Sequence, residues 1–159
     1  MYVKDAMAKA PACCSLETNL SAAVEIMWER NCGILPVVDA QQHVVGVITD
    51  RDIAVASGTR NQVPAEIKVA EAATRKVETC KPTDDIHTAL DTMAETKVRR
   101  LVVVNEQNRL EGILSMDDVV LTAGSTTGLK PEISADEVVR TLKTLYSPQL
   151  VARAARAAG

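Results

Sequence analysis

The sequence predicts a mixed α/β (α+β) fold made of two similar units followed by a C-terminal helix. An internal repeat is the main observation: shifting the 159-residue chain by 66 positions places Val3 on Val69 and Gly58 on Gly124 without a gap. Each copy contains one amphipathic helical pattern and two short runs rich in β-branched residues. Because a unit of about 60 residues buries little surface alone, we expect the two copies to pack as a pair around a pseudo-twofold axis.

The first helix of each copy is predicted from apolar residues at positions i, i+3, i+4 and i+7. This pattern is met by Leu20, Ala23, Val24 and Met27 and by Ile86, Ala89, Leu90 and Met93. The equivalent residues Thr18 and Asp84 are the predicted N-caps of these helices. A second helix is expected to begin near Asp50 in the first copy and near Met116 in the second.

Two strands are predicted between the helices of each copy. Residues 35–38 and 101–104 are apolar, rich in β-branched side chains and too short for buried helices. Polar turns connect them to residues 44–48 and 110–114, which predicts a hairpin in each copy. The unit is therefore helix, strand, strand, helix, with an extra short extended segment before it.

The predicted domains are residues 1–62 and 63–124, followed by residues 125–159 as a linker and an amphipathic helix. Ser134 begins a capping-box pattern, and Pro148 is expected to end the helix. The apolar face of this helix consists of Val138, Val139, Leu142, Leu145 and Tyr146. We expect this face to pack on the module itself or on a second chain, with docking onto an unidentified target protein as the alternative.

Composition and charge exclude several classes of function. A net charge of −3 provides no general attraction to nucleic acid or anionic lipid. One Trp, two Tyr and no Phe are too few for a platform that stacks bases. No apolar run approaches the roughly 20 residues that cross a bilayer, and the N-terminus lacks the layout of a secretory signal. We expect a cytoplasmic protein with no nucleic-acid or membrane partner.

The second strand of each copy ends in the pattern Gly-x-x-Thr/Ser-x-x-Asp. Thr49 with Asp52, and Ser115 with Asp118, thereby fall at a strand end and a helix start. Backbone N–H groups and a hydroxyl at such a corner can bind a phosphate or a sugar, and the carboxylate can accept both hydrogen bonds of a ribose diol. The same spacing also fits a capping box that satisfies itself. Both interpretations stay open for one motif, and two copies in register favour binding.

The repeat, the strands at residues 35–39 and 99–105 and the Gly-x-x-Thr/Ser-x-x-Asp corners together resemble the tandem cystathionine-β-synthase-type (CBS) domain pair over residues 1–124. Residues 98–104 and 112–115 particularly resemble the γ subunits of AMP-activated protein kinase. The resemblance implies a non-catalytic regulatory module that binds AMP, ADP, ATP or S-adenosylmethionine in the cleft between the repeats. It further implies a homodimer, with the nucleotide as a regulatory ligand and no obligatory cofactor.

The resemblance also assigns ligand-binding residues. The assigned ribose contacts are Thr49 and Asp52 in one cleft and Ser115 and Asp118 in the other. The assigned adenine contacts are Ile34, Leu35 and Pro36 in the first cleft and Arg100, Leu101 and Val102 in the second. Arg99 and Arg100 are assigned to phosphates, with a solvated surface or a salt bridge to a nearby aspartate as the alternative. Because Gly33 and Ile34 replace this pair in the first copy, we expect one occupied site, with Thr49 and Asp52 as its ribose contacts.

Cys14 and Cys80 occupy equivalent positions that line the predicted clefts. They motivate an alternative function, a ligand-free interaction module or a thiol- or metal-responsive stress sensor that uses these thiols and the C-terminal helix. Small buried residues are the simpler interpretation. The chain has four cysteines but no CxxC pair and no zinc ligand ladder, which predicts reduced thiols and no metal site. An enzyme is disfavoured because no nucleophile elbow, P-loop or paired-carboxylate site is present.

Overall fold

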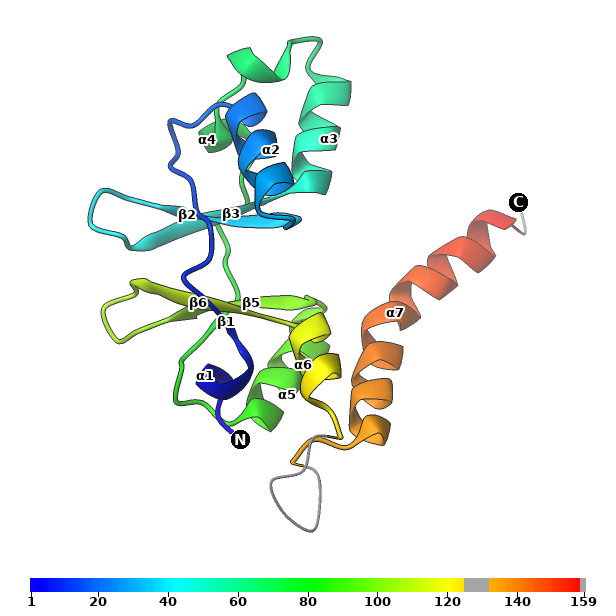
Figure 1. Cartoon of the computed structure of the whole chain (residues 1–159). Helices are drawn as coiled ribbons and strands as arrows, with labels where there is room; N and C mark the ends of the chain where they lie inside the picture. Colours follow the sequence, from blue (N-terminus) through cyan, green and yellow to red (C-terminus); the bar gives the residue numbers. More distant parts are fainter. Residues whose placement is uncertain (125–131, 158–159) are drawn as a thin grey trace. The chain divides into compact units, whose positions relative to one another are not determined.

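A computed structural model describes residues 1–124 and 132–157. Its helices are α1 (Val3–Ala6), α2 (Leu20–Glu29), α3 (Asp50–Thr59), the 3-10 turn η1 (Pro64–Glu66), α4 (Val69–Ala72), α5 (Ile86–Thr96), α6 (Met116–Thr122) and α7 (Ala135–Ala157). Its strands are β1 (Ala8–Lys9), β2 (Ile34–Val38), β3 (Val44–Thr49), β4 (Thr79–Cys80), β5 (Arg100–Val104) and β6 (Leu110–Ser115) (Figure 1). The predicted α/β fold class, with two copies of the helix–strand–strand–helix unit and a C-terminal helix, is confirmed.

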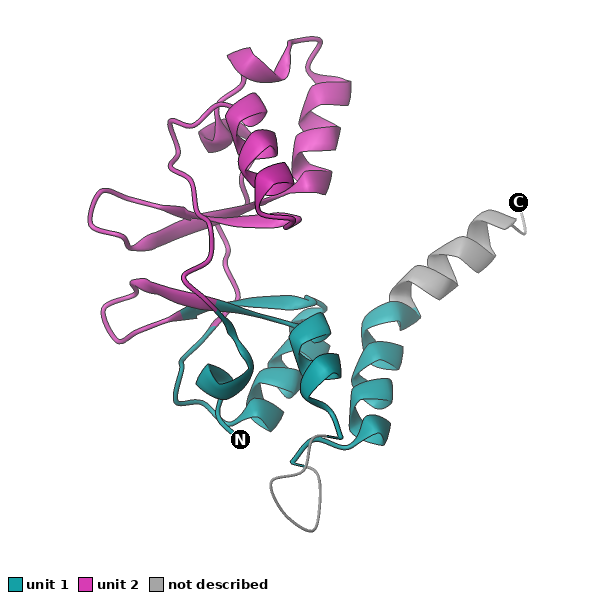
Figure 2. Cartoon of the chain, viewed as in Figure 1, with its two compact units in different colours: residues 1–8, 80–103, 113–159 teal, residues 9–79, 104–112 magenta. Residues whose placement is uncertain are grey.

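The chain forms two compact units (Figure 2). Unit 1 contains residues 1–8, 80–103 and 113–159, and unit 2 contains residues 9–79 and 104–112. Each unit therefore takes segments from both halves of the sequence. The two copies of the repeat are consecutive in the sequence, whereas the two compact units are made of segments that pack together in space.

In unit 2, helix α2 packs against the antiparallel β2–β3 hairpin and against α3. Leu35 pairs with Ile48 across the hairpin, and both side chains are fully buried. The buried core of the unit consists of Cys14, Leu20, Ala23, Met27, Leu35, Val37, Ile48, Ile53, Ala56, Ile67 and Val69. Val24, which the helical spacing places on the apolar face, is 45% exposed. The buried stripe of α2 is thus narrower than predicted.

In unit 1, helices α5, α6 and α7 lie side by side next to strands β5 and β6 (Figure 1). These strands belong to a four-stranded sheet with the order β1-β6-β5-β4. The core consists of Val3, Cys80, Ile86, Ala89, Leu90, Met93, Leu101, Val103, Leu114, Met116, Val119, Ile133, Val138 and Leu145. All four apolar positions predicted for α5 are buried, and α7 packs against α5.

The short helices α1 and α4 are equivalent in the repeat, and each joins the unit that contains the other copy's first helix. The N–H of Val3 donates to the carbonyl oxygen of Asp84 at 2.9 Å, just before α5. The N–H of Val69 donates to the carbonyl oxygen of Thr18 at 2.8 Å, just before α2. Both valines are fully buried. This reciprocal exchange explains why the units do not coincide with the sequence copies.

The N-caps of α2 and α5 lie one residue later than predicted. Asn19 and Asp85 each accept a backbone N–H of the first helical turn at 2.9 Å. The predicted caps, Thr18 and Asp84, instead accept the N–H three residues before them, at 3.1 and 2.7 Å. Since Thr, Asn and Asp all serve as caps, the sequence pattern could not choose between adjacent candidates. The same correction applies to both copies.

Helix α7 packs on its own unit. Ser134 accepts the N–H of Glu137 at 3.2 Å, which confirms Ser134 as the cap, whereas the Glu137 carboxylate contacts His87 and does not complete the predicted capping box. Val138 and Leu145 are buried, whereas Val139 is 48% exposed and Tyr146 is 37% exposed. The predicted linker falls on residues 125–131, which lie outside the described residues. Within the described ranges, no helix is both long and apolar enough to cross a membrane.

Pro148 does not end α7, which continues to Ala157. A proline inside a helix has no N–H for the carbonyl four residues earlier, and that carbonyl belongs to Thr144. The Nζ of Lys97 donates to this Thr144 oxygen at 3.3 Å. The tertiary contact therefore satisfies the group that the proline leaves free, and the prediction of a helix end was wrong.

Candidate functional site

The two Gly-x-x-Thr/Ser-x-x-Asp corners both form capping boxes. In unit 2 the Oδ2 atom of Asp52 accepts the N–H and the hydroxyl of Thr49 at 2.9 and 2.7 Å, and Thr49 Oγ1 accepts the Asp52 N–H at 3.2 Å. Ser115 and Asp118 repeat this geometry in unit 1, at 2.8, 2.6 and 3.2 Å. Among the described residues, the second carboxylate oxygen of Asp52 has no hydrogen-bond partner. The box fixes the side chain and leaves one anionic acceptor available.

The glycine of the first corner is explained by a close backbone approach. Val47 and Thr74 exchange two backbone hydrogen bonds of 2.9 Å, which brings the chain around Thr74 against β3. A Cβ atom on Gly46 would lie 3.0 Å from the Thr74 carbonyl oxygen, tighter than ordinary contact. A side chain at this position would have to displace backbone, so the motif requires glycine there for packing.

The residues predicted to enclose an adenine lie on both faces of strands β2 and β5. Leu35 and Leu101 are fully buried in the cores of their units, so only their backbones are available to a ligand. Ile34, Pro36 and Val102 alternate with these leucines and therefore lie on the other face of their strands. Pro36 and Val102 are buried as well, whereas Ile34 is partly exposed.

Cys14 and Cys80 are structural neighbours of the first strands. The N–H of Cys14 donates to the Pro36 carbonyl at 3.0 Å, and the N–H of Val38 donates to the Cys14 carbonyl at 2.9 Å. Cys80 lies in β4, at the end of the sheet next to β5. Both side chains are 7% exposed and belong to the hydrophobic cores. Their positions account for both cysteines as packing residues.

Burial raises the pKa of the Cys14 and Cys80 thiols to about 12. Both thiols are therefore protonated near neutral pH, and a protonated thiol is a poor nucleophile and metal ligand. All four cysteines are free of disulfides. In the part of the chain that the structure describes, no group of three or more His, Cys, Asp or Glu side chains could hold a metal ion. These observations give no support to the thiol- or metal-responsive alternative.

The stability of the protein is expected to fall at alkaline pH because of these thiols. An unfolded cysteine releases its proton near pH 9, whereas the folded thiols keep theirs up to about pH 12. Between these values the unfolded state binds fewer protons than the folded state, so the free energy of unfolding decreases as the pH rises. The contribution of the two buried thiols to the free energy of unfolding is fully present below about pH 9. Urea unfolding at about pH 8 and about pH 10.5 measures it, and the Cys14→Ala/Cys80→Ala variant should show a shallower decrease.

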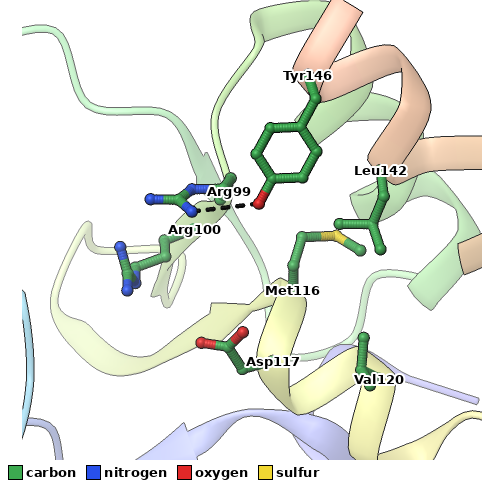
Figure 3. Close-up of a pocket in the computed structure, with 7 residues that line it drawn as sticks. All are labelled: Arg99, Arg100, Met116, Asp117, Val120, Leu142 and Tyr146. Carbon is green, nitrogen blue, oxygen red and sulfur yellow. Dashed lines mark hydrogen bonds between the residues drawn. The ribbon is translucent and has the colours of Figure 1, made fainter. Parts of the chain in front are cut away.

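Arg99 and Arg100 lie at the start of β5 and line a pocket of about 240 Å³ within unit 1 (Figure 3). The other lining residues are Met116, Asp117, Val120, Leu142 and Tyr146. Arg99 Nη1 donates to the Tyr146 hydroxyl oxygen at 3.3 Å. Within the described residues, neither arginine forms an ion pair with Asp117 or Asp118. Sequence reasoning missed Tyr146 as a partner of Arg99, and treated it only as part of an apolar helical face.

The corresponding positions of unit 2 carry different side chains. Arg99 and Met116 are replaced by Gly33 and Asp50, while one backbone hydrogen bond is kept: Met116 N–H to Arg99 oxygen at 3.0 Å, and Asp50 N–H to Gly33 oxygen at 3.3 Å. A Cβ atom on Gly33 would lie 2.9 Å from the Asp50 carboxylate. The repeat therefore preserves this backbone hydrogen bond and changes the charges around it, because Arg51 stands at the position of Asp117.

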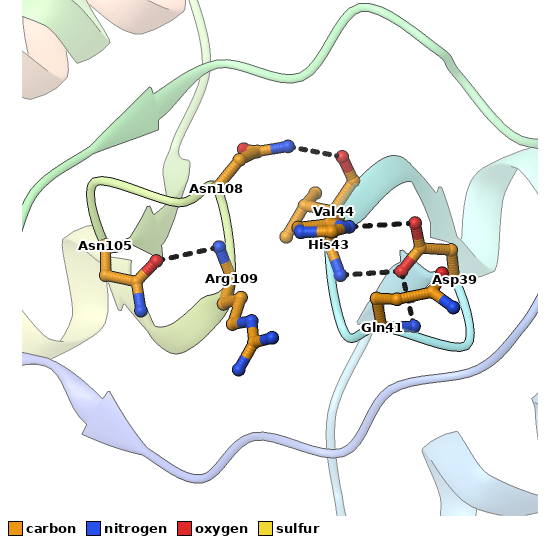
Figure 4. A network of polar contacts seen from close by, with 7 residues as sticks. All are labelled: Asp39, Gln41, His43, Val44, Asn105, Asn108 and Arg109. Carbon is orange, nitrogen blue, oxygen red and sulfur yellow. Dashed lines mark hydrogen bonds and ion pairs between the residues drawn. The ribbon is translucent and has the colours of Figure 1, made fainter.

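The hairpin turns of the two copies meet inside unit 2 (Figure 4). Asp39 and Asn105, which are equivalent, each accept the N–H groups two and four residues later through one side-chain oxygen, at 2.8 to 3.0 Å. Asn108 joins the turns, because its carbonyl accepts the Val44 N–H and its Nδ2 donates to the Val44 carbonyl, both at 3.0 Å. The hydrogen bonds from His43 lower the pKa of Asp39. This network holds the two hairpin turns in place. The candidate site residues lie at the opposite ends of the hairpin strands, next to the helices.

A duplicated α/β unit with a capping-box corner in each copy defines a tandem-repeat module. The chain belongs to the CBS domain family, because the CBS domain model matches residues 3–58 and 69–123. The CBS domain-containing protein YhcV of Bacillus subtilis is 34% identical over 75% of this chain and 83% of its own length. The γ-3 subunit of AMP-activated protein kinase of Bos taurus is 29% identical over 62% of this chain and 21% of its own length, which bears out that resemblance.

Several relatives are longer than the region they share with this chain. The match covers 33% of a protein of Thermofilum pendens and 22% of the inosine-5′-monophosphate dehydrogenase of Methanocaldococcus jannaschii, which is 30% identical. The match to this enzyme is therefore a CBS-region match, and no catalytic family is indicated for the chain.

Two solved structures have the same fold. The CBS domain pair of protein MJ0100, in complex with 5′-methylthioadenosine and S-adenosyl-L-methionine, has a TM-score of 0.70 at 26% identity, over 76% of this chain and 94% of that chain. Hypoxic Response Protein I with two coordinated zinc ions has a TM-score of 0.69 at 28% identity, over 76% of this chain and 98% of that chain.

Proposed function

We propose that the protein is a non-catalytic regulatory module that binds an adenosine-containing nucleotide at the corner formed by Thr49 and Asp52. The free carboxylate oxygen of Asp52, held in place by the capping box, is the observation that carries the proposal. A ribose diol has two donors that suit such an acceptor, and binding through this oxygen leaves the box intact. The adenosyl ligands of the related MJ0100 domain pair support the assignment.

Phosphate-bearing nucleotides are the favoured ligands within this class. Guanidinium groups bind phosphate bidentately, and the resemblance to the CBS domain pair assigns Arg99 and Arg100 to the phosphates of the ligand. S-adenosylmethionine carries a sulfonium cation and no phosphate, so that assignment favours AMP, ADP or ATP over it. The nucleotide acts by shifting a conformational equilibrium and not by a chemical step. We further propose that the protein works as a homodimer and regulates a separate target protein.

Titration calorimetry of the full chain with AMP, ADP, ATP and S-adenosylmethionine tests the proposal. We expect one site per chain, tighter binding for the phosphate-bearing ligands and no release of phosphate during prolonged incubation. GMP is the matched control for the adenine. Folded protein that binds none of the four ligands at millimolar concentration would contradict the proposed function, and hydrolysis of a bound nucleotide would contradict its non-catalytic character.

A further inference from the structure

We propose that helix α7 forms part of a phosphate-binding pocket in unit 1, in which Tyr146 positions Arg99 and binding of the ligand stabilises the docked helix. The inference rests on the proposed function only for the identity of the ligand as a nucleotide. The pocket itself is formed by residues of one unit, from the start of β5, from α6 and from α7 (Figure 3).

Tyr146 and Leu142 form the α7 wall of the pocket, opposite Asp117 of α6 (Figure 3). The Tyr146 hydroxyl accepts from Arg99 Nη1 at 3.3 Å, and Tyr146 is 37% exposed. The hydrogen bond restricts an otherwise flexible arginine and holds its guanidinium at the pocket. Restricting a side chain in its binding position reduces the entropy that a ligand must overcome. Tyr146 is thus a positioning residue that acts through Arg99.

The charges that line the pocket favour an anion. Arg99 and Arg100 contribute two guanidinium groups, and Asp117 contributes the one carboxylate among the lining residues. A guanidinium has five N–H donors, and Tyr146 takes one of those of Arg99. The remaining donors can meet a phosphate bidentately. The lining therefore suits a phosphate group, while Leu142 gives the pocket an apolar side.

Comparison of the two copies ties this pocket to α7. In unit 2 the position of Arg99 holds Gly33. The positions of Met116 and Asp117 hold Asp50 and Arg51. The segment after α3 continues into η1, whereas the chain after α6 leads to α7. The pocket that combines two adjacent arginines with a wall from α7 lies in unit 1, whereas a pocket of unit 2 combines Arg51 and Arg60 with the carboxylates of Asp52 and Glu71.

Ligand binding and docking of α7 are then linked. Two further contacts hold α7 on its unit. The Nζ of Lys97 donates to the Thr144 carbonyl oxygen at 3.3 Å, and the Leu145 side chain is buried in the core. When α7 is docked on unit 1, Tyr146 holds Arg99 at the pocket. A phosphate that contacts Arg99 therefore binds this docked state more tightly than a state in which α7 has left the unit. By thermodynamic reciprocity, docking raises the affinity by the same factor by which the ligand favours docking.

Two variants of Tyr146 in the full chain test the inference. Tyr146→Phe removes only the hydroxyl, and its affinity for ATP and for pyrophosphate should fall by about 2- to 10-fold, the range for one hydrogen bond. Tyr146→Ala also removes the wall and should lose at least as much. Val139→Ala, an exposed α7 residue outside the pocket, is the matched control and should bind as the wild type does. Far-UV circular dichroism confirms that each variant is folded.

Hydrogen exchange supplies a second readout that a merely structural role would not change. ATP or pyrophosphate should slow amide exchange in residues 138–147 of the wild type and should do so less in Tyr146→Ala. Binding of ATP that is unaffected by either Tyr146 variant overturns the inference and leaves the proposed function standing. Binding of pyrophosphate that depends on Tyr146, without any nucleotide binding, supports the inference and contradicts the proposed function. If neither probe binds, both fail.

Discussion

Replacing Leu101 by alanine is expected to lower the free energy of unfolding by about 2–5 kcal/mol, the range observed for large-to-small changes in protein cores. The side chain is 0% exposed and lies in the core of unit 1, between strand β5 and the helices. Removing it loses the transfer free energy of the buried methyl groups and leaves a cavity that the surrounding structure fills only in part. Urea unfolding followed by far-UV circular dichroism measures the change.

Two further variants make this result specific. Leu35→Ala removes the equivalent buried side chain of unit 2 and should cost a similar amount. Leu121→Ala changes a side chain that is 80% exposed, and its effect should stay within about 0.5 kcal/mol. A loss below about 1 kcal/mol for Leu101→Ala would mean that this strand face is not packed as described.

The Asp52→Asn variant is expected to bind adenine nucleotides about tenfold more weakly, or worse. Hydrogen bonds to a charged group contribute about 1.5–3 kcal/mol each, and 1.4 kcal/mol corresponds to a factor of ten in affinity. The asparagine keeps the volume of the side chain and one oxygen, which can still accept from Thr49. It replaces the free anionic oxygen by an NH₂ donor, which cannot accept from a ribose diol. Titration calorimetry with the tightest nucleotide measures the effect.

Asp118→Asn is the matched control, because it makes the same change in the equivalent capping box of unit 1. Its nucleotide affinity should stay near that of the wild type, since we assign the ribose to the first copy. Equal losses in the two variants would indicate two sites. A loss in Asp118→Asn alone would show that the ribose was assigned to the wrong copy.

The secondary structure was predictable because it depends on local patterns. Residues 35–38 and 101–104 lie within the strands β2 and β5, as their β-branched composition indicated. The spacing of Thr49 and Asp52 was compatible with a capping box and with a ribose-binding corner. The structure contains the capping box. Where adjacent residues were equally suitable, as for the cap of α2, the prediction was off by one position.

Side-chain burial was less predictable, because it depends on what packs against each surface. Val24 and Leu90 occupy equivalent helical positions, yet Val24 is 45% exposed and Leu90 is 2% exposed. The difference arises from α7, which packs against α5, whereas the main described neighbours of α2 are η1, α3 and β2. Likewise, the burial that raises the pKa of Cys14 comes from the strand beside it, which its neighbours in sequence do not reveal.

The amino-acid sequence alone was enough to establish the duplicated unit, its hairpins and its membership of the CBS family, because periodicity and repeated motifs survive as local patterns. The packing of the folded chain decided which segments share a core, through the exchange of α1 and α4 between the copies. It also decided that Tyr146 would meet Arg99, 47 residues away. A contact between residues so far apart depends on the path of the whole chain, and it leaves no local signal that a single sequence can show.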